Sequence, residues 1–157
     1  MKRVRYLTFK VERKKIIMPS ANALFVFNQL KAAFAPFKSY FKIVSDTPDE
    51  FEAITKEVIK VRKGSFTTTN THISFLYITL YKDYVKLQFH PFHLDNSLVG
   101  LVPPELLRFK KSVNTFKFKT IDRQLLQYID LLFRIGVESY KKQKFIIGMA
   151  LDLPPLQ

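Results

Sequence analysis

The stretch ISFLYITLYKDYVKLQFH, residues 73–90, restricts the fold more than any other part of the sequence. Apolar and polar residues alternate on both sides of Lys82-Asp83, which is the pattern of two half-buried strands. Lys82-Asp83 fits a two-residue turn, although Asp-Gly would be the stronger signal, and this turn pairs Tyr81 with Tyr84. We therefore predict a β-hairpin over residues 73–91, with its register set by the turn.

This register gives the hairpin two unlike faces. The predicted core face carries Leu76, Ile78 and Leu80 opposite Val85, Leu87 and Phe89. The second face carries Phe75, Tyr77, Thr79 and Tyr81 opposite Tyr84, Lys86, Gln88 and His90. Aromatic rings interleaved with hydrogen-bond donors are the means by which some RNA-binding sheets stack bases and hold phosphates.

The candidate ligand-binding or nucleic-acid-binding residues all come from this second face. They are Tyr77, Tyr84, Lys86, Gln88 and His90. The same residues also fit the solvated side of a sheet, because tyrosine favours strands and cross-strand aromatic pairs stabilise them. The sequence contains no RRM-type consensus run that would decide between the two interpretations.

The residues before the hairpin predict two helices and two strands. Residues 3–11 alternate as a strand, a basic turn follows at 13–15, and residues 39–44 predict another strand. Ser20 is a suitable cap for a helix over about 21–35, where Ala23, Phe27, Leu30 and Phe34 share one face and Pro36 ends the pattern.

A second helix is predicted over residues 47–63. Thr47 and Glu50 form the pattern of a capping box, with Pro48 between them at the first helical position. Phe51, Ile54, Val58 and Val61 recur at helical spacing, and Gly64 would end the helix. Its basic residues fit a solvated face better than a set of phosphate contacts: Lys56, Lys60, Arg62 and Lys63.

The remaining segments complete an α+β pattern. We predict a Thr-rich strand over 65–70, a short helix over 103–111, a strand over 114–119, a last strand over 145–151 and a flexible tail at 152–157. A long helix should run from a cap at Thr120 to about 143, with a buried stripe of Ile121, Leu125, Ile129, Leu132 and Tyr140. The whole chain, 1–157, is predicted to form one domain with a largely antiparallel, curved sheet and helices packed on it.

Charge and composition favour binding over catalysis. The net charge of +13 and the pI near 9.9 favour a polyanionic partner, nucleic acid in particular. The chain has no cysteine, which excludes disulfides, thiol catalysis and cysteine-ligated metal sites. Its four glycines stand singly at 64, 100, 136 and 148, which excludes a Gly-rich phosphate loop. We predict no catalytic residues and no cofactor.

The three histidines suggest only a weak metal candidate. His90, His93 and Asp95 have spacing that fits a divalent cation, and His72 would lie across the hairpin from them. Such histidines more commonly serve as turn residues, so we predict no metal. The basic N-terminus lacks the apolar region of a secretory signal, and no apolar run approaches the ~20 residues needed to cross a bilayer. We therefore expect no transmembrane segment and a cytoplasmic location, while the oligomeric state stays open.

Residues 47–143 resemble the YdhG-like group of small domains of unknown function. The resemblance is carried by DEFEAITKEVIKVRKG, ISFLYITLYKDYVKLQFH, NTFKFKT and the closing helix IDRQLLQYIDLLFRIGVESYKK, with 1–46 as an N-terminal extension. It implies a compact α+β fold with a curved sheet and no established chemistry. Some relatives have been proposed to handle iron, which needs clustered acids that this basic chain lacks.

Three other functions remain open beside nucleic-acid binding. The aromatic side chains would also suit an apolar pocket for a small molecule or a protein partner. A metal-dependent enzyme built on His90, His93 and Asp95 is a third alternative. A membrane-surface role is a fourth and weaker one, because no predicted helix separates its basic residues from a large exposed apolar face.

Overall fold

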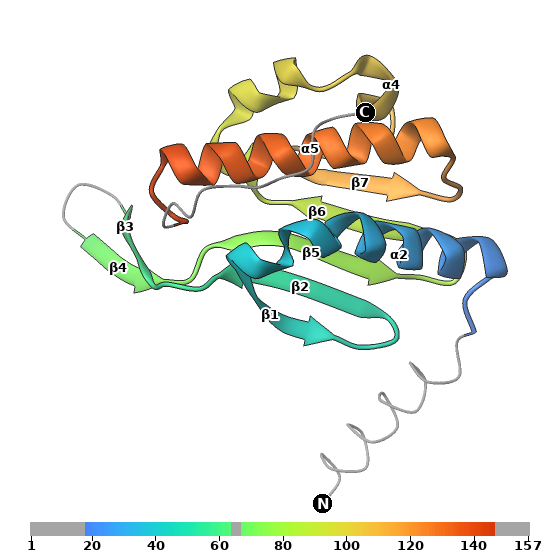
Figure 1. Cartoon of the computed structure of the whole chain (residues 1–157), viewed down its shortest axis with the longest axis horizontal. Coiled ribbons are helices and arrows are strands. Elements are labelled where there is room, and N and C mark those ends of the chain that lie inside the picture. Colours follow the sequence, from blue (N-terminus) through green and yellow to red (C-terminus); the bar gives the residue numbers. More distant parts are fainter. Residues whose placement is uncertain (1–17, 64–66, 147–157) are drawn as a thin grey trace, which may run out of the picture.

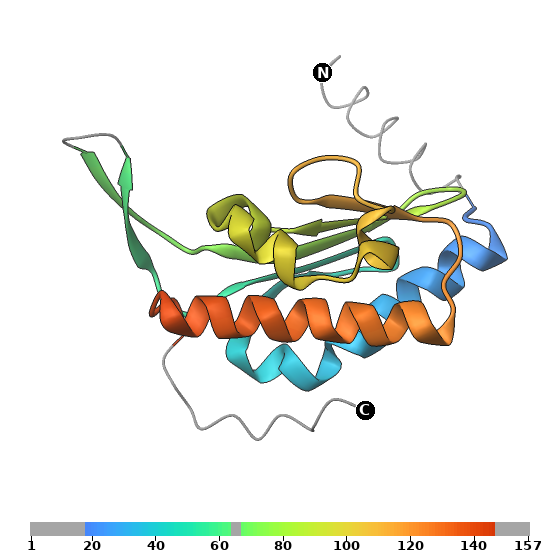
Figure 2. The ribbon, with the colours of Figure 1, turned by 90° about the horizontal axis from the view of Figure 1, so that it is seen from above.

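The fold consists of one antiparallel sheet with its two long helices on the same side (Figures 1 and 2). The computed structural model describes residues 18–63 and 67–146. The predicted α+β class with a largely antiparallel sheet is confirmed. Three predictions lie outside the described residues: the strand over 3–11, the turn at 13–15 and the tail at 152–157. Only the first two residues of the strand predicted over 145–151 are described.

The sheet is a five-stranded antiparallel meander in the order β1-β2-β5-β6-β7. Its strands are β1 (Phe41–Asp46), β2 (Glu50–Thr55), β5 (Ser74–Leu80), β6 (Val85–Phe89) and β7 (Thr115–Phe118). Between β2 and β5 the chain forms a separate two-stranded ribbon of β3 (Ile59–Lys63) and β4 (Thr67–Thr71). The strands predicted over 39–44, 65–70 and 114–119 correspond to β1, β4 and β7.

Helices α2 (Ala21–Phe34) and α5 (Arg123–Lys142) cover one face of the sheet. The predicted Ser20 cap is confirmed, since its Oγ accepts a hydrogen bond from the Ala23 N–H at 3.1 Å. A 3-10 helix, η1 (Ala35–Tyr40), contains Pro36 and leads into β1. Three short helices connect β6 to β7: α3 (Pro91–Leu94), η2 (Asn96–Leu101) and α4 (Pro104–Leu107).

Phenylalanine rings fill the layer between the sheet and the helices. Phe34 of α2 meets Phe133 of α5 edge to face, with ring centroids 5.6 Å apart, and Phe41 stacks on Phe75 at 4.3 Å. All four side chains are buried. Tyr140 of α5 is also buried, and its hydroxyl donates a hydrogen bond to the Ser74 carbonyl of β5. Such aromatic contacts add to the free energy gained from the burial of apolar area.

The predicted helix over 47–63 is wrong, because this segment forms β2 and β3. Side chains along β2 alternate with period two: Phe51, Ala53 and Thr55 are buried, while Glu50 and Glu52 are not. Val58, which a helix would have buried, is 52% exposed. The sequence pattern was ambiguous because Phe51 begins both a helical and an alternating series of apolar positions.

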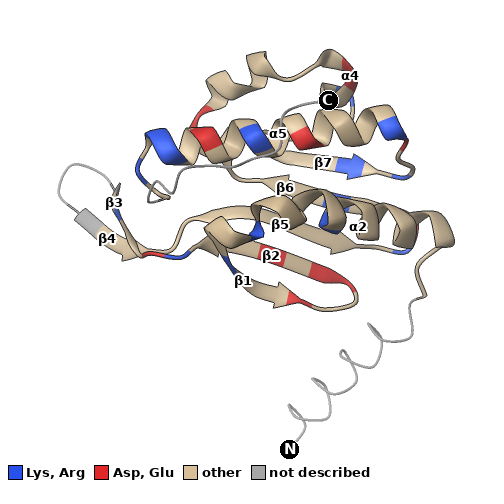
Figure 3. Cartoon of the chain, viewed as in Figure 1, with Lys and Arg blue, Asp and Glu red and all other residues tan. Residues whose placement is uncertain are grey.

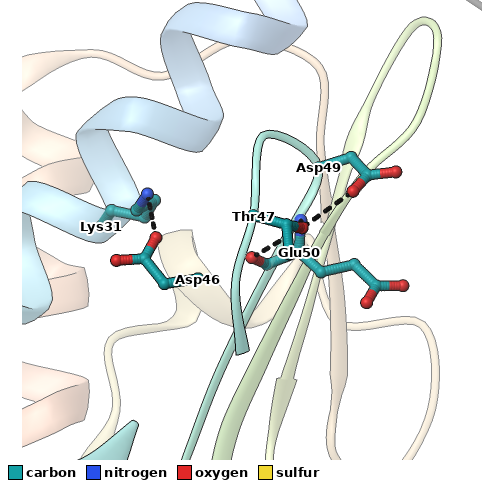
Figure 4. A network of polar contacts seen from close by, with 5 residues as sticks. All are labelled: Lys31, Asp46, Thr47, Asp49 and Glu50. Atoms are coloured by element: carbon teal, nitrogen blue, oxygen red, sulfur yellow. Dashed lines mark hydrogen bonds and ion pairs between the residues drawn. The ribbon is translucent and has the colours of Figure 1, made fainter. Parts of the chain in front are cut away.

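The capping-box residues instead build the turn between β1 and β2 (Figure 4). The Thr47 hydroxyl accepts a hydrogen bond from the Glu50 N–H at 3.1 Å and donates one to Asp49 Oδ1 at 2.9 Å. Beside the turn, Lys31 Nζ of α2 lies 2.6 Å from Asp46 Oδ1 of β1. A threonine hydroxyl that accepts a hydrogen bond from the N–H three residues later therefore occurs in a turn as well as at a helix start.

The predicted hairpin and its register are confirmed from Leu76 to Phe89. Tyr81 N–H donates to the Tyr84 carbonyl at 2.9 Å, and Leu76, Ile78 and Leu80 pair with Phe89, Leu87 and Val85. Phe75 was expected on the second face but is fully buried in the core. A β-bulge against β2 makes Phe75 the extra residue between the pairs Ala53–Leu76 and Ile54–Ser74, and a bulge redirects a side chain.

The long C-terminal helix is confirmed, but its cap is Asp122 and not Thr120. The Asp122 carboxylate accepts a hydrogen bond from the Leu125 N–H at 2.7 Å. The predicted residues Leu125, Ile129, Leu132 and Tyr140 are all buried. Ile121 lies before the helix and is half-buried against the core. Either residue type caps helices well, so the pattern alone did not distinguish the two positions.

Candidate binding face of the sheet

The second face of the sheet carries the candidate residues, and neither long helix covers it (Figure 2). We call it the open face. Its side chains are half-buried or exposed, and they come from β2, β5, the turn after β5, β6 and β7: Glu50, Glu52, Tyr77, Thr79, Tyr81, Tyr84, Lys86, Gln88, Thr115 and Lys117. The strand register arranges them in rows across the sheet.

One end of the open face is basic and aromatic. Tyr81 and Tyr84 flank the two-residue turn and stack with their ring centroids 4.7 Å apart and their planes at 15°. Lys86 Nζ lies 5.6 Å from the Tyr81 ring centroid, and Lys117 Nζ lies 4.8 Å from the Tyr84 centroid. The ring quadrupoles attract both ammonium groups, which holds the two positive charges beside the tyrosine pair.

The other end of the open face is acidic. Burial and the charge of Glu50 raise the pKa of Glu52. Burial, a hydrogen bond with Glu50 and the charges of Glu50 and Glu52 raise the pKa of Tyr77. Tyr77 therefore keeps its proton and acts as a hydrogen-bond donor to a carboxylate at the acidic end.

The strand register places the acidic and basic side chains in rows across the sheet, and the charge changes sign along the first row. One row runs Glu50–Thr79–Lys86–Lys117, from an acid on β2 to bases on β6 and β7. The next row runs Glu52–Tyr77–Gln88–Thr115. An anion on this face is therefore attracted toward β6 and β7 and repelled from β2.

The structure divides the five candidate residues into three places. Tyr84 and Lys86 lie together at the basic end, whereas Tyr77 and Gln88 lie in the neighbouring row, where Tyr77 pairs with Glu52. Sequence reasoning left Tyr81 and Lys117 out of the candidate set. The alternation in NTFKFK places Lys117 on a polar face, but only the pairing of β7 with β6 brings it to the tyrosines.

His90 does not lie on the open face, because the strand ends before this residue. It stands at the start of α3 with helical backbone angles, and its N–H donates to the Phe75 carbonyl at 3.0 Å. Burial and the nearby charge of His93 lower the pKa of His90, whose ring centroid lies 5.3 Å from that of His93. A lowered pKa keeps the imidazole neutral at physiological pH, where it contributes no charge to an anion site.

The weak metal candidates do not converge. Asp95 Oδ1 accepts hydrogen bonds from the Ser97 N–H and hydroxyl. His72 Nδ1 lies 2.8 Å from the Thr55 carbonyl, at the end of β2. Within residues 18–63 and 67–146, no three His, Asp or Glu side chains are grouped so as to hold a metal ion.

Comparisons with known proteins return no matching family model, no matching curated protein and no matching solved structure. Of the helices that the structure describes, none is long and apolar enough to span a bilayer.

Proposed function

We propose that the protein is a non-catalytic module that binds single-stranded nucleic acid through the basic end of the open face. The observation that carries this proposal is the Tyr81–Tyr84 stack with Lys86 and Lys117 beside it. Two ammonium groups next to aromatic rings match the two halves of a nucleotide, because phosphate pairs with the charge and the base stacks on a ring.

The tyrosine pair limits how a base can bind. Each ring is stacked on the other and has an ammonium group over it, so a base does not enter between the rings. A base stacks on an outer face or an edge once Lys86 or Lys117 turns from the ring to a phosphate. Stacking on an aromatic side chain contributes about 1–3 kcal/mol per base, and each phosphate contact adds a salt-dependent contribution. The acidic end then directs the strand along β6 and β7, because Glu50 and Glu52 repel phosphate.

An RNA titration tests the proposal. Fluorescence anisotropy with a short, labelled, mixed-sequence single-stranded RNA compares the wild type with a Lys86→Ala/Lys117→Ala double variant at several salt concentrations. We expect weaker binding and a slope of log affinity against log salt that is less steep by about 1.4, because each lost phosphate contact on a single strand contributes about 0.7.

Two further variants make this titration specific. Lys142→Ala removes one exposed lysine from α5, on the opposite side of the sheet, and should leave binding nearly unchanged. Tyr84→Ala should weaken binding more than Tyr77→Ala, since Tyr77 donates to an acid. Equal affinity and an equal salt slope in wild type and double variant would refute the proposal.

A protein partner is the second candidate function, supported by the outer side of α2. Leu24 and Phe25 are 42% and 53% exposed there, and Met18, just before the helix, is 78% exposed. This function predicts binding with little salt dependence, which distinguishes it from the first. The aromatic side chains that would line an apolar pocket instead contact one another, as Phe34, Phe75 and Phe133 do. Membership of the YdhG-like group and a cytoplasmic location remain proposals.

A further inference from the structure

The outer face of α2 is exposed and carries almost no charge. Both long helices cover the same side of the sheet, but six of the 20 residues of α5 are charged, whereas Lys31 is the one charged residue among the 14 of α2. Figure 3 shows this contrast, with blue and red segments along α5 and a largely tan α2. An exposed helical face of apolar and uncharged side chains marks a site of contact with another molecule.

The exposed residues of α2 form a stripe with the spacing of a helix–helix contact. The stripe consists of four residues at steps of four, three and four: Ala21, Phe25, Asn28 and Ala32. Alternating steps of three and four are those of the contact residues of a coiled coil. Leu24 is exposed beside the stripe, and Met18 and Ala35 are exposed just beyond its two ends. The stripe therefore continues over the full length of the helix.

The stripe is symmetric about its midpoint in the size of its residues. Two antiparallel copies of α2 that cross at this midpoint place Ala21 opposite the other copy's Ala32. They also place Phe25 opposite the other copy's Asn28. The alanines let the two helix backbones approach closely, and each large ring meets a smaller side chain. A two-fold contact uses the same surface on both copies, so it requires a stripe that is complementary to itself, as this one is.

The charges beside the stripe also fit a second copy of the chain. Two chains of net charge +13 repel each other, so they meet where charge is absent or paired. The Lys31 ammonium lies 2.6 Å from Asp46 Oδ1, which offsets its charge beside the stripe. In the antiparallel pair Lys31 lies opposite the other copy's Asn22, nine residues from that copy's Lys31. This is about 14 Å along the axis, more than the Debye length of about 8 Å at physiological salt.

We infer that the protein forms a dimer in which the α2 helices of two copies pack against each other in antiparallel orientation. A helix of 14 residues is about 21 Å long and about 10 Å wide, a smaller contact than the ~800 Å² per partner of a standard interface. The dimer is therefore weak, and its population depends on the protein concentration. The inference rests on the second candidate function, to which it gives a specific partner, and is independent of RNA binding by the open face.

The dimer leaves the open face of each copy accessible. Helix α2 lies on one side of the sheet and the open face on the other (Figure 2). Two open faces held in one particle bind a strand long enough to reach both more tightly than a strand that reaches only one, because the second contact is made within the complex.

Sedimentation equilibrium of the full chain without nucleic acid, from low micromolar to near-millimolar concentration, tests the inference. We expect the weight-average mass of the wild type to rise from that of one chain, 18.5 kDa, towards twice that value. Phe25→Glu should stay at the mass of one chain, because it places a charge within the contact. Val113→Glu is the matched control and should associate like the wild type. Val113 lies between α4 and β7 and is 52% exposed, against 53% for Phe25.

Two double variants test the antiparallel arrangement. Ala21→Glu/Ala32→Lys places opposite charges across the contact twice, whereas Ala21→Glu/Ala32→Glu places like charges there twice. We expect the first variant to associate about tenfold more tightly, although the second carries less positive charge and so less overall repulsion. Circular dichroism checks that both variants fold.

Three outcomes would overturn the inference. One is a wild type that stays at the mass of one chain at every concentration, which would leave the second candidate function open to a different protein partner. The others are equal association of the two double variants and equal association of Phe25→Glu and Val113→Glu. Because these measurements contain no RNA, they leave the open-face proposal to its own titration.

Discussion

Gly136 shows how one residue sets the distance between α5 and the sheet. A Cβ added at this position would lie 2.6 Å from Cζ of Phe89 and 2.9 Å from Cε1 of Phe75. Both rings are fully buried and packed against other aromatic side chains, so neither can move away freely. The glycine therefore allows α5 to approach the bulge in β5 more closely than any other residue would.

We predict that Gly136→Ala destabilises the protein by about 1–3 kcal/mol, because overpacking of a tight core costs more than the ~1 kcal/mol that alanine gains in a helix. Urea unfolding followed by circular dichroism measures the change. Gly100→Ala is the matched control, because a Cβ there meets nothing within 4 Å, and we expect a change within about 0.5 kcal/mol. Equal effects at both positions would contradict the packing explanation.

At the scale of elements, residues 47–63 show how tertiary pairing overrides a local helix signal. Val58, Ile59 and Val61 are β-branched and lose side-chain freedom in a helix, which weakens the helical alternative. As a strand, β2 pairs on both sides with β1 and β5 and buries Phe51 and Ala53 completely. A helix in this place would leave β1 and β5 without the strand that pairs with both, so the pairing across the sheet favours the strand.

The start of α5 carries a prediction at the same scale. Asp122→Ala should cost about 1 kcal/mol, because it removes the side chain that accepts from the Leu125 N–H and the negative charge near the helix start. Thr120→Ala, two residues earlier, should change stability by less than about 0.5 kcal/mol. Thermal unfolding of the two variants checks the assignment of the cap, and a larger loss in Thr120→Ala would contradict it.

At the scale of the whole molecule, the open face separates charges of opposite sign. Lys86 and Lys117 lie at its basic end on β6 and β7, while Glu50 and Glu52 form an acidic end on β2. The net charge of +13 draws any polyanion toward the protein, but the arrangement of charges decides where it binds. Composition therefore predicts association, and the fold predicts the location.

The buried Tyr140 makes the free energy of unfolding of the whole fold decrease as the pH rises in the alkaline range. Burial raises the pKa of Tyr140 in the folded state far above its ordinary value, so the unfolded chain loses the phenolic proton first. Stability is then complete below about pH 10 and falls as the pH rises above it. Tyr140→Phe should flatten this loss, while it lowers stability at neutral pH by about 1–2 kcal/mol because the Ser74 carbonyl loses its donor.

Chemical unfolding of wild type and Tyr140→Phe from neutral pH to about pH 11 measures both effects. Parallel pH profiles for wild type and Tyr140→Phe would contradict the assignment to Tyr140.

The sequence by itself determined the features that depend on neighbours along the chain. The hairpin register, the Ser20 cap, the buried stripe of α5 and the α+β class all follow from periodicity and turn chemistry, which act over a few residues. These signals also placed Tyr84 and Lys86 on one face before any contact was known.

Only the tertiary structure decided the features that depend on pairing between distant segments. Four features depend on which strands are neighbours. They are the bulge that buries Phe75, the strand at 50–55, the position of Lys117 beside Tyr84 and the charge gradient across the sheet. The physical reason is that strand pairing and burial are shared between segments far apart in the chain, so these particular segments do not contain the information that settles their conformation.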